Sequence, residues 1–289
     1  MENVSTPVTP VERRFPLPPN RRFVFPNPAR KPTISVERES KMTIVAGFNC
    51  ADGVVLAADT QITHYNNQSQ SYEGKIFCVG ESCYIGYSGD VAATKEIREE
   101  LEKEVADNRD SPSLHTALKA KIKQIHKEQF TLAPKNEKTI LSLLLVIHEQ
   151  NKWKLYCTSG GNFFPVDGYQ LLGIGHDTGR AVFEPLYSLD LTMQETKNLA
   201  AYGLGIVKRY VQGCGGPSHI YAFGNDWISR ELDPTPEILT DSEELEERFK
   251  FFEKAMRPLL LAFPSSDSKD FAKRLERFAG ELQNFRGES

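Results

Sequence analysis

Short apolar runs separated by turn residues predict antiparallel strands from residue 43 onward. Thr43–Phe48 is followed by the polar stretch Asn49–Gly53 and then by a second apolar run, Val54–Asp59. Two such runs joined by a short segment that ends in Asp-Gly are typical of a β-hairpin. Lys75–Val79 and Ser82–Tyr87 have a similar composition and predict two more strands.

Helices are predicted farther along, where apolar residues recur every three or four positions. The first follows Asp90, a suitable N-cap residue, and the second comes soon after it. The two apolar faces consist of Ala93, Ile97, Leu101 and Val105 and of Leu114, Leu118, Ile122 and Ile125. A third helix begins with the capping box Thr192–Glu195 and ends before Gly213.

The segments around these helices predict the remaining strands of the core. They are Ile140–Ile147, Leu155–Ser159, Asn162–Val166, Leu171–Gly173 and Ser218–Phe223. The first of them is apolar enough to be buried on both faces. Strands and helices in this order predict the α+β class.

The two ends of the chain differ from its middle, and they divide it into three parts. Residues 1–41 contain eight prolines, a spacing that excludes a helix or a central strand. We expect a disordered Pro/Arg-rich extension there; a propeptide, an arm that docks on a neighbouring subunit and untranslated sequence are the alternatives. Residues 42–231 form the predicted core. Residues 232–289 carry two apolar stripes that predict a C-terminal helical extension, packed on its own core or on another subunit.

Charge and composition narrow the classes of function. Eight basic and four acidic residues give residues 1–41 a charge of +4, which leaves −8 on the remainder of a chain with a net charge of −4. We therefore expect no nucleic-acid partner. The longest apolar run is far shorter than the ~20 residues of a membrane helix, so we expect no membrane span. Five cysteines without a close pair predict reduced thiols in a cytoplasmic protein, and we expect neither a cofactor nor a metal.

Thr43, Asp59 and Lys75 supply a hydroxyl, a carboxylate and an ammonium that could meet at one end of a sheet. Asp59 follows Thr43 by 16 residues, and Lys75 follows it by 32. A threonine hydroxyl needs an adjacent base, and an N-terminal α-amine with a pKa of about 8 can serve. A lysine ammonium would favour the hydroxyl's anion, while a carboxylate would hold that lysine charged and oriented. Each residue also has a structural interpretation, as a strand start, a turn former and a surface lysine.

The segments that contain these residues resemble the proteasome-type family of N-terminal-nucleophile hydrolases. The matching segments are Thr43, Asp52–Asp59, Lys75–Phe77 and Gly86–Asp90, with weaker similarity at Gly173–Gly175 and Gly213–Gly216. The similarity is closest to the β-type subunits and to the bacterial two-ring peptidase that works with an unfoldase ATPase. It implies a four-layer αββα sandwich, in which two antiparallel sheets are covered by helices.

The resemblance also implies roles for particular residues. Thr43 would be the nucleophile, assisted by Asp59 and Lys75, and the backbone N–H of Gly89 would donate to the oxyanion. A glycine suits that position because it lets a substrate backbone approach closely. The positions that match the first specificity pocket are Ile62, Glu73, Tyr87 and Val91.

These residues predict a threonine-type endopeptidase subunit. It would cut unfolded polypeptides inside a homo-oligomeric ring, with an unfoldase ATPase as a partner. The alternative is a non-catalytic structural or scaffold subunit of the same family. A more distant one is an amidase that acts on a small molecule, since fold alone does not fix the substrate. The helix typical of α-type chains is not visible in residues 1–41, which favours the enzyme.

Three positions depart from the pattern of active family members. Ile174 and Val211 match positions that usually carry serine and aspartate, and Cys214 matches a further serine. Isoleucine and valine side chains form no hydrogen bonds. Either the polar network is rebuilt around His176, Asp177 or Cys214, or catalysis is lost.

The nitrogen of Thr43 matters as much as its hydroxyl. While Met42 precedes Thr43, that nitrogen is an amide and cannot accept the hydroxyl's proton. We expect the functional chain to begin at Met42 and to lose this methionine, with residues 1–41 either untranslated or removed by another route.

Overall fold

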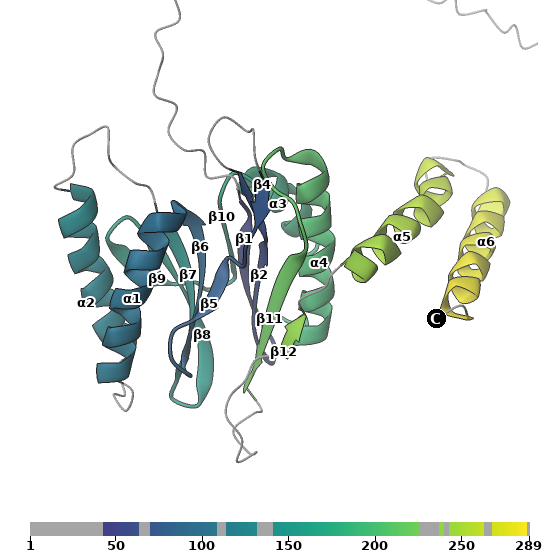
Figure 1. Ribbon diagram of the computed structural model, residues 1–289. Coiled ribbons are helices and arrows are strands. Elements are labelled where there is room, and N and C mark those ends of the chain that lie inside the picture. The colour runs from purple at the N-terminus through teal and green to yellow at the C-terminus, as the bar shows by residue number, and fades with distance from the viewer. Residues whose placement is uncertain are drawn as a thin grey trace, which may run out of the picture. The chain divides into compact units, whose positions relative to one another are not determined.

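The computed structural model describes residues 43–63, 70–108, 114–131, 141–225, 237–239, 243–262 and 268–287 (Figure 1). The predicted N-terminal extension, residues 1–41, and Met42 lie outside these ranges. Within them, no helix combines the length and the apolar character that crossing a membrane requires.

One five-stranded sheet contains the predicted hairpin at its centre. Its strands, in spatial order, are β10 (Tyr169–Leu172), β1 (Val45–Cys50), β2 (Gly53–Asp59), β11 (Ser218–Gly224) and β12 (Glu237–Leu239). All neighbouring pairs are antiparallel. The β1–β2 register pairs Val45 with Ala58, so the start of β1 and the end of β2 lie at the same end of the hairpin.

A second five-stranded sheet is also fully antiparallel. Its strands, in spatial order, are β5 (Ile76–Cys78), β6 (Cys83–Gly89), β7 (Leu141–Glu149), β8 (Lys152–Ser159) and β9 (Asn162–Pro165). A separate ribbon of β3 (Gln61–Thr63) and β4 (Gln70–Tyr72) connects β2 to β5 along the chain. This ribbon was not predicted, because its two short polar strands show no apolar alternation.

Helices cover the outer faces of both sheets, as Figure 1 shows. The α1 and α2 helices lie beside the sheet that contains β6 and β7, and the α4 helix lies beside the sheet that contains β2 and β11. The bounds are α1 (Val91–Asp107), α2 (Leu114–Ile125), the π-helical turn η2 (His126–Thr131), α3 (His176–Phe183), α4 (Met193–Tyr210), α5 (Glu243–Ala262) and α6 (Ser268–Gly287). The predicted α+β four-layer sandwich is confirmed.

Alternating side chains of β1 divide the core into layers. Val45 packs in the cluster between the two sheets, together with Leu56 and Leu144. Ala46 and Phe48 point the other way, into the cluster covered by α3 and α4. Residue 86 is a glycine, and this lets the two sheets approach closely. A Cβ added to Gly86 would lie 2.7 Å from a side-chain carbon of Val45.

Predicted caps fix the starts of two helices. The Asp90 carboxylate accepts a hydrogen bond from the backbone N–H of Ala93 at 2.8 Å and so begins α1. Thr192 and Glu195 form the capping box of α4. Both helices thereby start where the sequence predicted.

Of the two C-terminal helices, α5 packs on α4 and α6 packs on α5. Phe249 of α5 lies with its ring centroid 5.2 Å from that of Tyr202 in α4, and Phe252 of α5 meets Phe278 of α6 at 5.7 Å. Strand β12 lies beyond residue 231 and pairs with β11. The division into parts at residues 41 and 231 stays a prediction.

Candidate active site

Thr43, Asp59 and Lys75 meet at one end of the β1–β2 hairpin. The Thr43 hydroxyl donates to Asp59 Oδ1 at 2.7 Å, and Lys75 Nζ donates to the same oxygen at 2.7 Å. All three residues are buried, with 3%, 0% and 3% of their surface exposed. Because β1 and β2 are antiparallel, the residue just before β1 and the last residue of β2 lie at the same end of the strand pair. This geometry explains why Thr43 and Asp59 meet.

Asp59 is the centre of this group. Its Oδ1 also accepts the backbone N–H of Ile44 at 2.9 Å, and its Oδ2 accepts the backbone N–H of Gly215 at 3.0 Å. A buried carboxylate is tolerated when donors satisfy its oxygens. Four donors from three segments of the chain do so here, and we call Asp59 with Thr43, Ile44, Lys75 and Gly215 the Asp59 hub.

The loop after β10 covers the backbone of Thr43. The Thr43 carbonyl accepts the N–H of Gly175 at 3.2 Å. Gly173 has a φ of +93°, and a Cβ added there would lie 2.1 Å from the Thr43 carbonyl oxygen. Only glycine permits both this backbone conformation and this approach, so the loop is built to pack against Thr43.

Burial and charge have opposing effects on the ionisable groups of the site. Burial lowers the pKa of Lys75 below its usual value, while the neighbouring Asp59 carboxylate acts in the opposite direction. Burial, reinforced by Asp59, raises the pKa of the Cys214 thiol to about 12. Cys214 is therefore a neutral thiol near neutral pH and not an activated nucleophile.

The proposed oxyanion donor, Gly89, lies at the end of β6, directly before the N-cap of α1. Its φ of +142° is in the region that favours glycine. In the described part of the chain, the groups that donate to Asp59 come from Thr43, Ile44, Lys75 and Gly215, and not from Gly89. Its role in chemistry stays a prediction.

The four residues assigned to a specificity pocket come from β3, the position just after β4, β6 and α1. Ile62, in β3, and Tyr87, in β6, are buried. Glu73 is exposed and forms an ion pair with Lys95 at 4.0 Å, and Val91 is the first residue of α1. Burial, with a smaller contribution from Glu73, raises the pKa of Tyr87 to about 12. Their role as a pocket stays a prediction.

Ile174 and Val211 stand where active family members usually carry serine and aspartate, and neither supplies a polar side chain. The Ile174 side chain is exposed, and Val211 ends α4 and packs against the cluster beneath α3 and α4. His176 Nδ1 lies 3.0 Å from the carbonyl oxygen of Gly173 and its Nε2 lies 3.1 Å from Asp177. Neither His176 nor Asp177 is among the residues that hydrogen-bond the trio in the described part of the chain.

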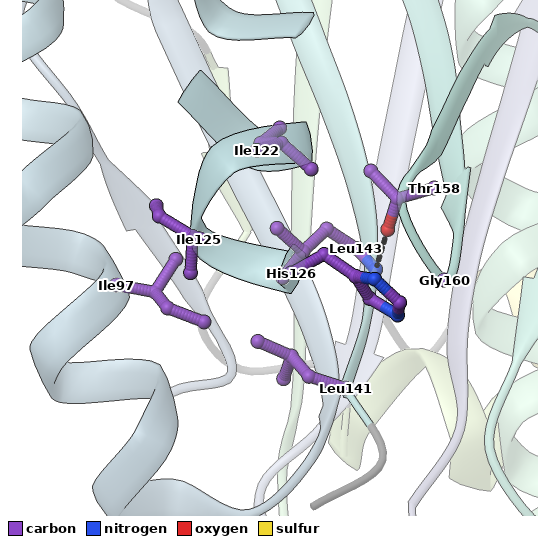
Figure 2. Close-up of a pocket in the computed structure, with 8 residues that line it drawn as sticks. All are labelled: Ile97, Ile122, Ile125, His126, Leu141, Leu143, Thr158 and Gly160. Carbon is purple, nitrogen blue, oxygen red and sulfur yellow. Dashed lines mark hydrogen bonds between the residues drawn. The ribbon is translucent and has the colours of Figure 1, made fainter. Parts of the chain in front are cut away.

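A small apolar hollow lies elsewhere in the molecule (Figure 2). It is lined by Ile97, Ile122, Ile125, His126, Leu141, Leu143, Thr158 and Gly160, and Figure 2 shows the hydrogen bond from the Leu143 backbone N–H to the Thr158 hydroxyl. Its volume of about 20 Å³ accommodates about one water molecule. None of its residues belongs to the Asp59 hub. In the described ranges, no three His, Cys, Asp or Glu side chains are placed to hold a metal ion.

The sequence comparisons identify the family. The family model described as Proteasome subunit matches residues 40–210, more than half of the chain. This chain belongs to the proteasome subunit family. The match includes Thr43, Asp59, Lys75 and the loop that covers Thr43.

Curated relatives point to one subtype within the proteasome subunit family. The chain is 29% identical over 164 residues to proteasome subunit alpha of Pyrococcus abyssi, a match that covers 55% of this chain and 61% of that protein. It is 29% identical over 164 residues to proteasome subunit alpha of Methanococcus maripaludis strain C5, covering 56% and 63%. The chain thus spans less than two thirds of these relatives. The predicted family is confirmed, although the relatives indicate the alpha subtype where the sequence motifs suggested the β type.

Two contacts of this proteasome-family site were not predicted from the sequence. One is the N–H of Gly215, which donates to Asp59, and the other is the carbonyl of Gly216, which accepts Lys208 Nζ at 2.8 Å. The Gly213–Gly216 segment was recognised only as a weak family match. Hydrogen bonds made by backbone groups cannot be predicted from the pattern of side chains. The glycines of this segment were the only sequence feature that could have indicated these two contacts.

Proposed function

We propose that this chain is a structural subunit of a proteasome-like oligomer, in which the Asp59 hub holds the fold together instead of cleaving peptides. The observation that carries this proposal is the direction of the Thr43 hydroxyl, which donates to Asp59 Oδ1 at 2.7 Å. That oxygen also accepts Ile44 N–H and Lys75 Nζ. With three donors on one oxygen, the Thr43 hydroxyl is one of the hydrogen bonds that satisfy a buried carboxylate.

Access to Thr43 supports the same proposal. Only 3% of its surface is exposed, and its carbonyl is covered by the loop that contains Gly173 and Gly175. In the full sequence its nitrogen is an amide, which cannot take the hydroxyl's proton. The nucleophile therefore lacks both a base and room for a substrate while residues precede it.

Family membership supports the assembly part of the proposal, since the similar proteins are named as alpha subunits. In this proposal copies of the chain form a homo-oligomeric ring in the cytoplasm. An unfoldase ATPase and unfolded polypeptides are partners of the assembly, not substrates of this chain.

A second candidate function is a threonine-type peptidase, which the arrangement of hydroxyl, carboxylate and ammonium favours. Cleavage directly before Thr43 would convert its amide to an amine, which would take the hydroxyl's proton as the oxygen attacks a peptide carbonyl. The amine would later return that proton to the leaving group. Gly89 would then donate to the oxyanion, and Ile62, Glu73, Tyr87 and Val91 would contact the substrate.

The two candidate functions predict different peptidase activities for a chain that starts at Thr43. Such a chain can be made by fusing a cleavable partner directly before Thr43 and removing it, and the 289-residue chain is the comparison. We expect both to form oligomers by light scattering and neither to hydrolyse a panel of fluorogenic peptides. Hydrolysis by the trimmed chain that is lost in its Thr43→Ala variant would establish the second candidate instead. Monomers in both samples, with a mass of 32.6 kDa for the 289-residue chain and correspondingly less for the trimmed one, would contradict the oligomer.

A further inference from the structure

The C-terminal helix α5 contacts α4 through a charged pair that is largely buried. Lys208 Nζ lies 2.5 Å from Glu246 Oε1, with 10% and 12% of the two side chains exposed. Ser218 Oγ donates to the same carboxylate oxygen at 3.2 Å. Removing one member of such a pair leaves a charge in a poorly solvated place, so the pair holds the two helices in one arrangement.

Lys208 also connects α4 to the segment Gly213–Pro217, which we call the glycine loop. Its Nζ donates to the carbonyl of Gly216 at 2.8 Å. Gly216 has a φ of +72°, and a Cβ there would lie 2.5 Å from Thr60 Oγ1. A Cβ on Gly215 would lie 2.1 Å from Gln61 Oε1. The backbone of the loop is therefore pressed against the residues that follow Asp59.

The glycine loop in turn connects to the hub. Gly215 donates its N–H to Asp59 Oδ2 at 3.0 Å, while its carbonyl accepts the N–H groups of Thr60 and Gln61 at 3.2 and 3.0 Å. A continuous series of contacts thus runs from Glu246 through Lys208, Gly216 and Gly215 to Asp59.

We propose that Glu246 and Lys208 are positioning residues for the Asp59 hub, so that the docking of α5 on α4 controls how firmly the glycine loop holds Asp59. A second pair between the same helices shows what is specific to this link. Arg209 Nη1 lies 2.8 Å from Glu253 Oε2, with 33% and 28% of the side chains exposed. Within the described part of the chain it joins α4 to α5 with no hydrogen bond to the glycine loop, which makes it a matched control.

Cys214 provides a readout that requires no enzymatic activity, because it lies within the glycine loop and is 4% exposed. In Lys208→Met, we expect Cys214 to react roughly tenfold faster with a thiol reagent, measured by peptide mass spectrometry, because a hydrogen bond from a charged group no longer restrains the loop. Glu246→Gln keeps that bond but removes the charge that positions Lys208, so it should give a smaller increase in the same direction. Arg209→Met should leave that rate within about twofold. Cys157, which is 2% exposed in β8, reports general unfolding in every sample.

A double variant separates the effect of the Lys208–Gly216 hydrogen bond from a general loss of stability. Lys208→Met with Glu246→Leu replaces the buried pair by apolar side chains of similar size, which often restores stability. It cannot donate to Gly216, so Cys214 should still react faster at an unchanged Cys157 rate. Wild-type protection of Cys214 in this double variant, or an equal acceleration at Cys157 in all the variants, would overturn the proposal. Because the chain is tested for loop opening and not for hydrolysis, the outcome does not depend on which proposed function is correct.

Discussion

Two buried carboxylates, Asp59 and Glu149, are satisfied by similar donors in different surroundings. Glu149, at the end of β7, accepts the Tyr156 hydroxyl at 2.9 Å, lies 2.6 Å from His115 Nδ1 and accepts the His115 backbone N–H at 2.9 Å. Lys154 Nζ lies 3.7 Å away. Both centres therefore combine a carboxylate with a hydroxyl, a cationic or ionisable group and a backbone N–H.

The role of Glu149 is structural by its position. It receives an N–H at the start of α2, where the helix leaves N–H groups unpaired and where negative charge is favourable. A hydroxyl and a cation beside a carboxylate thus follow in this fold from the need to satisfy a buried acid. The same set of groups around Asp59 is not by itself a sign of catalysis.

The two centres differ in how far their basic side chains reach solvent. The His115 and Lys154 side chains are 39% and 40% exposed, whereas the Lys75 side chain is 4% exposed. Losing the acid leaves solvated partners at Glu149 but an unsolvated ammonium at Asp59. The comparison therefore predicts unequal costs for matched changes.

The largest effect is expected for Asp59→Ala. It removes the acceptor of four hydrogen bonds and leaves Lys75 buried without its counter-charge. We expect a loss of about 3–5 kcal/mol in the free energy of unfolding, measured by urea titration. The exposed Glu73→Gln variant is the control, and a cost below about 1 kcal/mol for Asp59→Ala would contradict the hub.

Glu149→Gln should cost less, about 1–2 kcal/mol in the same titration, because the partly exposed His115 and Lys154 remain hydrated and the amide oxygen can still accept a hydrogen bond. Tyr156→Phe, which removes one donor to Glu149, serves as the matched change on the other side of the contact. If Glu149→Gln proved as costly as Asp59→Ala, solvent access would not be what separates the two centres.

Alkaline pH should weaken the fold through thiols such as Cys214. Its pKa is raised from 9.0 to about 12, mainly by burial. Above pH 9 the unfolded chain loses this proton while the folded chain keeps it, so the free energy of unfolding falls as pH rises from 9 toward 12. Cys214→Ala should reduce this slope by about 1 kcal/mol per pH unit. An unchanged slope between pH 9 and 11 would show that the thiol ionises equally in both states.

Thr43→Val should have the smallest effect of the series. It removes one donor to Asp59 Oδ1, which keeps Ile44 N–H and Lys75 Nζ, and it preserves the shape of the side chain. A loss of about 1 kcal/mol in the free energy of unfolding is expected. Thr43→Ser, which retains the hydroxyl, is the control; equal costs for the two variants would mean that the hydroxyl contributes nothing to stability.

The sequence predicted those parts of the fold and site that depend on local patterns. The hairpin of Thr43–Asp59 followed from two apolar runs and a turn, and its antiparallel geometry brought Thr43 to Asp59. The starts of α1 and α4 followed from capping residues. These features are encoded by neighbouring residues, so one sequence suffices to find them.

Two kinds of feature were missed: very short strands and contacts between residues distant in sequence. Strands β3, β4 and β12 have only three residues each, too few to show a period. Lys208 and Glu246 are separated by 38 residues and look like ordinary surface charges of two helices. Their burial arises only when α5 packs on α4, and the apolar stripes left open whether α5 packs on this chain or on another subunit.

The most direct test of the structural role is the peptidase assay on a chain whose first residue is Thr43. It supplies the free amine that the full sequence lacks, and it leaves Asp59 and Lys75 in place. The structural hub predicts no hydrolysis of any peptide in the panel above the rate of the Thr43→Ala chain, with both chains assembled. Turnover that requires the Thr43 hydroxyl would contradict it and make this subunit a peptidase.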